Sequence, residues 1–287
     1  MLRNFVGVLF DGLAYGSLLF LISNGLSVTL GLMNFVNLAH GAFAMLGAYT
    51  CLALQRRGVP FLLALPAAFL AAAVAGAVLE RALFRRLYRA PQLDQVLFSI
   101  GITFMAVATA TWLFGPGQQG VPRPDLLVGR MRILGVDLGR YQLFLILLVV
   151  VITALLESLV VRTRFGAQVR AAVDNRAAAE GLGIDVGRVF SVTFALGTGL
   201  AGLGGALAID LLGLDPTFAL KYLIYFLLAV TVGGPGSARG TAAAALLLGV
   251  FDIAGKYYVP DAGAFIIYAL MVVLLLLFPK GLYGRRA

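Results

Sequence analysis

The chain has 287 residues, of which 61% are apolar and 12% charged, and its formal net charge is +9. Soluble domains contain roughly 45–50% apolar and about 25% charged residues, so a single soluble core would not hide this much apolar surface. The composition therefore predicts a protein that spans a membrane and contacts membrane lipid. The positive charge does not predict binding of nucleic acid, because the arginines cluster between apolar stretches, as they do in membrane proteins.

Motifs for catalysis and metal binding are absent from the sequence. Cys51 is the only cysteine and His40 the only histidine, which excludes an internal disulfide framework and argues against a metal site. There is no phosphate-binding G-x-x-x-x-G-K-[ST] loop and no G-x-S-x-G or H-E-x-x-H motif. We therefore expect no cofactor, no metal, no catalytic residue and no nucleotide hydrolysis by this chain.

The N-terminal apolar run follows Arg3 and has the outline of a signal peptide. Asp11 interrupts the run, no A-x-A cleavage site follows, and further apolar stretches come after it. We therefore expect the run to be a first transmembrane helix and not a cleaved segment.

Apolar stretches recur along the whole chain, and a helix needs about 20 such residues to cross the hydrocarbon layer. The stretch 221–232 is too short to cross alone and ends in Gly233-Gly234-Pro235-Gly236, so it is expected to be a half-helix or part of a re-entrant hairpin. We predict an all-α helical bundle with about eight crossings, nine being the alternative. The candidate spans lie near residues 5–30, 35–54, 61–83, 95–114, 141–161, 188–212, 221–232, 238–254 and 264–278.

The placement of basic residues predicts the orientation in the membrane. Segments 80–94 and 162–188 and the C-terminus are rich in arginine or lysine and are expected on the cytoplasmic side. Loop 115–140 then faces outward, and with nine crossings the N-terminus does too. This Gly- and Pro-rich loop is either a plain connector or a docking surface for an extracytoplasmic partner. The basic residues concerned are Arg81, Arg85, Arg86, Arg89, Arg162, Arg164, Arg170, Arg176, Arg188, Lys280, Arg285 and Arg286.

Small and acidic residues occur within the predicted spans. Gly12 and Gly16 are four apart, and segment 197–205 is rich in glycine, a spacing that favours close approach of helix backbones in lipid. Four acids lie near predicted helix ends, where we expect hydration at the membrane interface, and the alternative is a functional role for an intramembrane carboxylate. They are Asp11, Glu157, Asp210 and Asp252.

Three polar residues precede the second apolar stretch at a spacing of three: Asn34, Asn37 and His40, with Gly41 directly after them. On a helix this spacing would place them along one face. Polar side chains at membrane depth must find partners or line a wet cavity. The four residues are therefore candidates for a translocation pathway or gate, and the alternative is a structural clamp of interhelical hydrogen bonds.

Segment 162–187 is too polar to span and too rich in helix-forming residues to be a disordered tail. Asp174 is a good N-cap for a second short helix, and Gly181 and Gly183 can end that helix in the left-handed conformation. We expect two short helices that fit a groove on a cytoplasmic partner. The alternative is a solvated amphipathic hairpin.

These segments together resemble the branched-chain amino acid ABC permeases, in particular the first of the two paired permeases of such systems. The resemblance covers nearly the whole chain and is carried by residues 12–49, segment 162–185, Gly233-Gly234-Pro235-Gly236-Ser237 and Phe278-Pro279-Lys280-Gly281-Leu282. It implies a single permease domain over 1–287 with the fold of a type II ABC importer permease. It also implies a cytoplasmic coupling loop at 162–187 and an external loop at 115–140. The coupling residues implied are Arg170, Ala171, Asn175, Ala178, Gly181, Gly183 and Ile184.

The resemblance further implies a location in the bacterial inner membrane and a set of partners. These are a second homologous permease subunit, two ATP-binding subunits that hydrolyse ATP, and an extracytoplasmic substrate-binding protein. The motif here has Val36-Asn37-Leu38 where the family more often has Ile-Asn-Phe. The substrate therefore stays open between branched-chain or related amino acids and urea or short-chain amides. The rival functions are a stand-alone secondary transporter of a small polar solute and an intramembrane enzyme.

Overall fold

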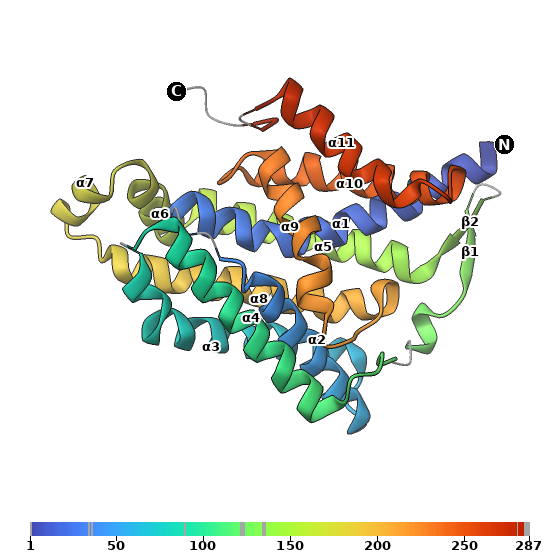
Figure 1. The fold of residues 1–287 in the computed structure, drawn as a ribbon, viewed down its shortest axis with the longest axis horizontal. Coiled ribbons are helices and arrows are strands. Elements are labelled where there is room, and N and C mark those ends of the chain that lie inside the picture. Colours follow the sequence, from blue (N-terminus) through green and yellow to red (C-terminus); the bar gives the residue numbers. More distant parts are fainter. Residues whose placement is uncertain are drawn as a thin grey trace.

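The computed structural model describes residues 2–33, 35, 37–88, 90–120, 124–133, 136–279 and 281–283. Across these ranges the chain is built almost entirely from helices, as Figure 1 shows. The helices are α1 (Leu2–Met33), α2 (His40–Arg56), α3 (Phe61–Ala82), α4 (Gln92–Phe114), α5 (Arg140–Arg162), α6 (Arg164–Asp174), α7 (Arg176–Gly181), α8 (Val186–Leu212), α9 (Phe218–Gly233), α10 (Ala238–Tyr258) and α11 (Gly263–Leu277), with short 3₁₀ turns η1 (Phe84–Leu87) and η2 (Asp125–Leu127).

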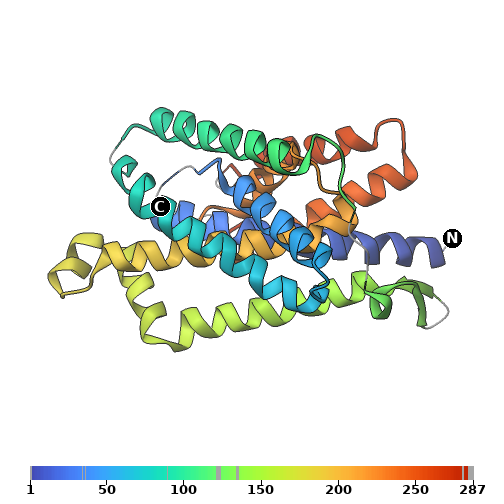
Figure 2. The ribbon, with the colours of Figure 1, turned by 90° about the horizontal axis from the view of Figure 1, so that it is seen from below.

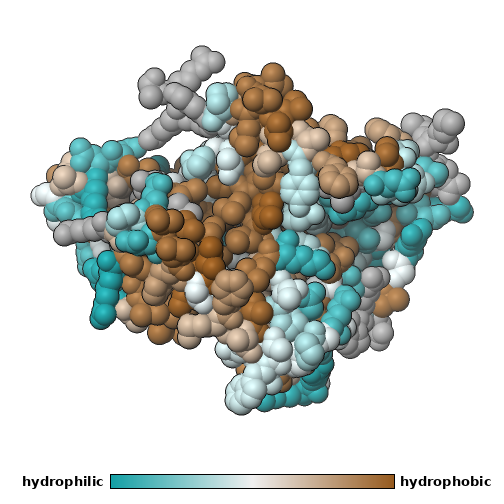
Figure 3. Space-filling model, viewed as in Figure 1, coloured by the Kyte–Doolittle hydropathy of each residue, from teal (hydrophilic) through white to brown (hydrophobic). Residues whose placement is uncertain are grey.

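Six of the described helices, α1, α3, α4, α5, α8 and α10, are long and apolar enough to cross a membrane. The helices α9 and α11 are apolar but shorter, with 16 and 15 residues. Figure 3 shows the apolar side chains gathered across the middle of one face, with hydrophilic residues toward both ends. The prediction of a polytopic helical membrane protein is confirmed.

The bundle has two distinct ends. Helices α6 and α7 project from one end, and a β-hairpin lies at the other, beside the start of α1 (Figures 1 and 2). We call these the α7 end and the hairpin end. Arg85 and Arg176 line one cavity at the α7 end. The C-terminal residues return there too, because Leu282 N donates to Val232 O at 2.7 Å. Segments 80–94 and 162–188 therefore share one end with the described C-terminal residues, whereas Lys280, Arg285 and Arg286 lie outside the described residues.

Glycines allow the central helices to approach closely, as their spacing predicts. A Cβ atom added to Gly12 would lie 2.7 Å from Val250 Cα, and one added to Gly16 would lie 2.7 Å from Leu246 Cα. A side chain at Gly47 of α2 would overlap the backbone of Gly202 in α8. Van der Waals contact between backbones is what holds helices together in lipid, where no hydrophobic driving force acts between them.

Three details differ from the sequence prediction. The second helix begins at His40 and not near residue 35. Loop 115–140 contains an antiparallel hairpin, β1 (Arg130–Ile133) and β2 (Val136–Gly139), which an all-α description omits. The short helix expected at 221–232 is α9, which begins earlier, at Phe218, and ends at Gly233, where Gly234 takes a φ of +96°. A helix of this length rises about 24 Å, short of the hydrocarbon thickness of about 30 Å.

Candidate functional site

The described residues between α1 and α2, 35 and 37–39, are not helical, which alters the spacing argument made for Asn37 and His40. The Oδ1 atom of Asn37 accepts a hydrogen bond from Ala39 N at 3.0 Å, so this amide competes with the helix for backbone donors. Asn37 therefore precedes α2, whereas His40 is its first residue. The premise that they occupy one helical face is wrong. Asn34 lies outside the described residues.

Helix α4 satisfies the backbone of this broken segment. Leu38 N donates to Ser99 Oγ at 3.1 Å, and Thr103 Oγ1 donates to Leu38 O at 3.4 Å. Phe35 packs edge-on against Phe84, with ring centroids 5.5 Å apart. Irregular backbone at membrane depth persists only where protein or a water-filled cavity surrounds it. In this conformation the surroundings are protein.

The candidate pathway residues lie together and are buried. His40 is fully buried, and its Nε2 donates to the carbonyl of Ile22 in α1 at 2.8 Å. Asn37 is 1% exposed. A Cβ atom on Gly41 would lie 2.6 Å from Ala219 O, so α9 covers the start of α2 at this point. Asn37 Nδ2 and His40 Nδ1 have no hydrogen-bond partner within the described part of the chain. Such unpaired buried groups are uncommon and mark a place where a partner is missing.

The two short helices expected in segment 162–187 are present as α6 and α7. Asn175 joins them, and its Oδ1 accepts from Ala178 N at 3.0 Å. The N-cap predicted at Asp174 is therefore wrong by one residue, because Asp174 is the last residue of α6. Gly183 has a φ of +81° and ends α7, with Ile184 N donating back to Ala179 O at 3.0 Å. Gly181 is the last residue of α7 and is not left-handed.

Helix α6 is attached to the membrane-spanning part, whereas α7 is exposed. Arg170 donates from Nη1 to the carbonyl of Val160 in the last turn of α5, which satisfies one of the carbonyls left free there. Helix α6 also contacts α1 and α8. On α7, Ala178 and Gly181 are exposed, and Leu182 just beyond it is 81% exposed. Ala171 of α6 and Ile184, which follows α7, are half-buried.

The sequence interpretation missed one buried carboxylate, that of Glu80 in α3. Glu80 of α3 is fully buried and accepts hydrogen bonds from Tyr88 Oη at 2.6 Å and Ser191 Oγ at 2.5 Å. Burial and the contact with Glu80 raise the pKa of Tyr88. Glu80 stands one residue before Arg81, so in the sequence it resembles an ordinary flanking charge. Tyr88 also lines a cavity of about 370 Å³. The other lining residues are Arg85, Arg86, Arg176, Gly187 and Phe190.

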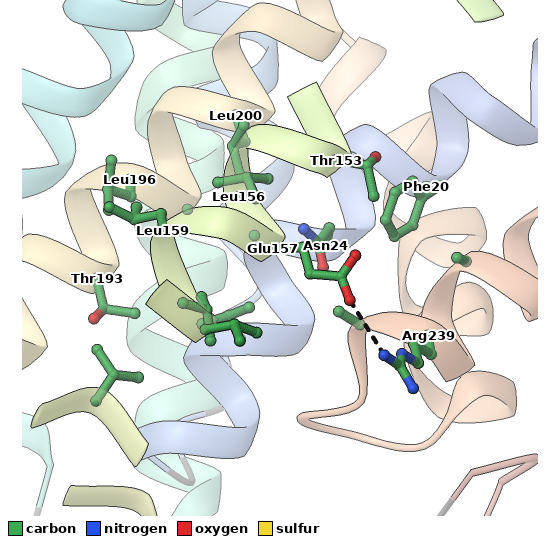
Figure 4. Close-up of a pocket in the computed structure, with 18 of the residues that line it drawn as sticks. Phe20, Asn24, Thr153, Leu156, Glu157, Leu159, Thr193, Leu196, Leu200 and Arg239 are labelled. Atoms are coloured by element: carbon green, nitrogen blue, oxygen red, sulfur yellow. Dashed lines mark hydrogen bonds and ion pairs between the residues drawn. The ribbon is translucent and has the colours of Figure 1, made fainter. Parts of the chain in front are cut away.

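An apolar cleft of about 250 Å³ opens between α5 and the central helices (Figure 4). Glu157 of α5 and Arg239 of α10 form an ion pair across it, with Oε1 and Nη2 3.2 Å apart. Figure 4 shows Asn24 on the same side of the cleft as this pair. Two residues of α6 also contribute to the wall. The apolar lining includes Phe20, Val28, Leu156, Leu159, Phe165, Val169, Leu196 and Leu200.

The acids expected to be hydrated at the interface divide into two groups. Asp11 and Glu157 are exposed and Asp210 is half-buried, and their contact with interfacial water stays a prediction. Asp252 is fully buried and accepts from Lys256 Nζ at 2.6 Å, so interfacial hydration is the wrong explanation for it. Within the described residues, no three His, Cys, Asp or Glu side chains come together in a way that could hold a metal ion.

The described helices are those of a multi-pass membrane protein with a buried, non-helical break between α1 and α2. The chain belongs to the family described as the branched-chain amino acid transport system / permease component, whose model matches residues 8–275.

Curated relatives of similar length match almost the whole chain. The high-affinity branched-chain amino acid transport system permease protein LivH of Salmonella typhimurium is 25% identical over 98% of this chain and 96% of its own length. The corresponding protein BraD of Pseudomonas aeruginosa is 26% identical over the same shares. A probable LivH of Methanocaldococcus jannaschii is 26% identical over 96% of this chain and 92% of its own. No solved structure matches.

Proposed function

We propose that this chain is the membrane-spanning permease subunit of an ABC importer for branched-chain or related amino acids, located in a bacterial inner membrane. Family membership supports the transport role. The observation that carries the ATP-driven mechanism is the projecting pair α6–α7, which joins two spanning helices and exposes Leu182 and small residues at its tip. The proposed complex contains a second homologous permease, two ATP-binding subunits and an extracytoplasmic binding protein.

In this proposal the α7 end is cytoplasmic and the ATP-binding subunits hold α6–α7. They must bind it differently in their two nucleotide states, because only differential contact shifts a conformational equilibrium. Gly183 and the Asn175 cap fix the shape of the projecting pair. Arg170 links it to the end of α5, and α6 contacts α1 and α8. A displacement of α6 therefore reaches three spanning helices directly.

The transported solute passes beside the break between α1 and α2 in this proposal. Asn37, His40 and Gly41 are the described members of the pathway, and Asn34 is proposed with them. Because α9 covers Gly41 here, access requires α9 to move away from α2. Neutral amide and imidazole groups contact a zwitterion without trapping it, and their unpaired nitrogens supply the contacts.

Accessibility of introduced cysteines tests the pathway. In a Cys51→Ser background, Asn37→Cys should react with a membrane-impermeant thiol reagent in at least one nucleotide state of the assembled complex. It should be protected when the complex adopts the conformation described here, in which residue 37 is 1% exposed. If cysteines at 34, 37 and 40 are unreactive in every state while uptake persists, the residues form a structural clamp.

Reconstitution tests the function itself. The permease pair and its ATP-binding subunits are placed in liposomes, and the binding protein and radiolabelled leucine are supplied on the hairpin side. ATP inside should drive leucine accumulation, and the purified chain alone should hydrolyse no ATP. Uptake without ATP but with an ion gradient would establish a secondary transporter instead. ATP-driven uptake of urea or short-chain amides, with no uptake of leucine, would change the substrate class.

A further inference from the structure

The cleft of Figure 4 combines groups that suit one class of small molecule. Glu157 and Arg239 supply one negative and one positive charge 3.2 Å apart. Leucine side chains line the other side of the same cleft. An aliphatic amino acid has the complementary arrangement, with an ammonium and a carboxylate on one carbon and an apolar side chain beyond it.

We propose that this cleft binds the transported amino acid, with its ammonium at Glu157, its carboxylate at Arg239 and its aliphatic side chain among Leu156, Leu196 and Leu200. This inference rests on the proposed function and names the substrate site within it. The pair at the mouth opens easily, because the side chains of Glu157 and Arg239 are 59% and 84% exposed and such surface pairs are weak. A zwitterion exchanges the one ion pair for two.

Unpaired polar atoms at the cleft support a polar ligand. Asn24 is 5% exposed and Thr193 is 4% exposed, and both line the cleft. Asn24 Oδ1 and Thr193 Oγ1 have no hydrogen-bond partner among the described residues. A lipid acyl chain in the cleft would leave both groups unsatisfied, whereas an ammonium held at Glu157 can hydrogen-bond to Asn24 Oδ1, which lies on the same side of the cleft.

The size of the cleft also favours a small ligand. Pockets that bury drug-sized molecules usually enclose about 300–1,000 Å³. This cleft encloses about 250 Å³, which suits a single amino acid. Its floor is the contact of α1 with α8, where a Cβ atom on Gly197 would lie 3.0 Å from Gly25 O. The missing side chains at Gly25 and Gly197 let the two backbones meet there, which closes the cleft on that side.

The cleft also provides a direct route from ATP to the substrate. Phe165 and Val169 of α6 form part of its wall. Helix α6 belongs to the segment that we propose the ATP-binding subunits hold. A movement of α6 toward or away from α8 therefore closes or opens the cleft without any intermediary. Binding of nucleotide and binding of substrate then both act on α6, which forms this wall of the cleft.

Cysteine protection tests the site in the assembled complex, without the binding protein. Leu196→Cys, made in a Cys51→Ser background, should react with a thiol reagent, and L-leucine should slow that reaction at least fivefold. Isoamylamine lacks the carboxylate and 4-methylpentanoate lacks the ammonium, so each should protect less than leucine. Protection by added phospholipid and not by leucine would make the cleft a lipid site and overturn the inference.

Transport by matched variants provides a second test. Glu157→Gln and Arg239→Gln should each raise the KM for leucine uptake at least tenfold, whereas Arg132→Gln, which removes an exposed ion pair in the hairpin, should not. Ala242→Trp fills the cleft and should abolish uptake. Ala106→Trp is its control, because Ala106 is an equally half-buried alanine that lines a separate apolar cavity of about 200 Å³.

The outcomes separate this inference from the proposed function. ATP-driven leucine uptake by the wild-type complex establishes the function whatever the variants do. If that complex transports leucine, but the Glu157, Arg239 and Ala242 variants all keep the wild-type KM, the substrate binds elsewhere. If the wild type shows no ATP-driven uptake, the function fails, while protection of residue 196 by leucine still reports whether the cleft binds an amino acid.

Discussion

Helices α1 and α8 form a closely packed centre, whereas α5 is loosely attached at the side of the bundle. In their most apolar stretches 61% of the residues of α1 and 78% of those of α8 are buried, against 11% for α5. Glycines make the centre close, because backbone meets backbone at Gly16 and Gly47. Beside α5, long side chains enclose the cleft. The contrast separates a closely packed frame from a helix whose surface is largely free of contacts within this chain.

The largest expected effect comes from inserting a side chain into the centre. Gly47→Leu places a side chain where the backbone of Gly202 already lies, so the two helices must separate. Overpacking usually costs about 1–3 kcal/mol, and a clash with backbone on both sides falls at or above the top of that range. We expect no monodisperse folded protein in detergent, as measured by size-exclusion chromatography and thermal unfolding.

Gly101→Leu is the matched control for that variant. Gly101 is also within a spanning helix, α4, but a Cβ atom there meets nothing within 4 Å. It should purify and unfold like the wild type. If Gly47→Leu and Gly101→Leu behave alike, the centre is not more rigid than the periphery, and the contrast drawn above is wrong.

A smaller effect is expected where the frame contains a buried charge. Ser191→Ala and Tyr88→Phe each remove one of the two hydroxyl donors to the buried carboxylate of Glu80. Hydrogen bonds to charged groups contribute about 1.5–3 kcal/mol, so each variant should be destabilised by about 2 kcal/mol. Thermal unfolding in detergent measures the change. Tyr257→Phe, at a half-exposed tyrosine of α10, should change stability by less than about 0.5 kcal/mol.

Gly181 and Gly183 of the coupling loop 162–187 have the same predicted role in the sequence, but substitution should affect them differently. Gly183 has a φ of +81°, so Gly183→Val should cost about 1–2 kcal/mol locally and distort the end of α7. Gly181 is helical and faces open space, so Gly181→Val should be tolerated. We expect Gly183→Val to lower the amount of leucine transported per ATP hydrolysed more than Gly181→Val does. Equal coupling in both variants would show that the shape of α7 is not what the ATP-binding subunits recognise.

The sequence predicted elements that depend on local pattern and missed features that depend on three-dimensional contact. Apolar periods and lengths located the spanning helices, and helix-forming residues located α6 and α7. The break at Asn37 was missed because it needs Ser99 and Thr103 of α4 to satisfy Leu38, and no local pattern records that partner. Glu80 and Asp252 resemble flanking charges until the fold buries them.

The residues that form the cleft are even further apart in the sequence. Glu157 and Arg239 are 82 positions apart, and each alone resembles an interfacial charge. No spacing rule pairs them, because their meeting depends on how α5 and α10 pack around α1. Their types could be noted in the sequence, but their combination with Leu196 and Leu200 could not.

The smallest expected effect concerns this same ion pair. Because both side chains are more than half exposed, the pair should contribute only about 0–1 kcal/mol to the free energy of unfolding. A double-mutant cycle with Glu157→Gln, Arg239→Gln and the double variant, followed by thermal unfolding in detergent, should give a coupling energy below about 0.5 kcal/mol. The same variants should change leucine transport strongly. A coupling energy above about 2 kcal/mol would instead make the pair part of the frame, because charges that hold α5 against α10 so firmly would not open for a ligand.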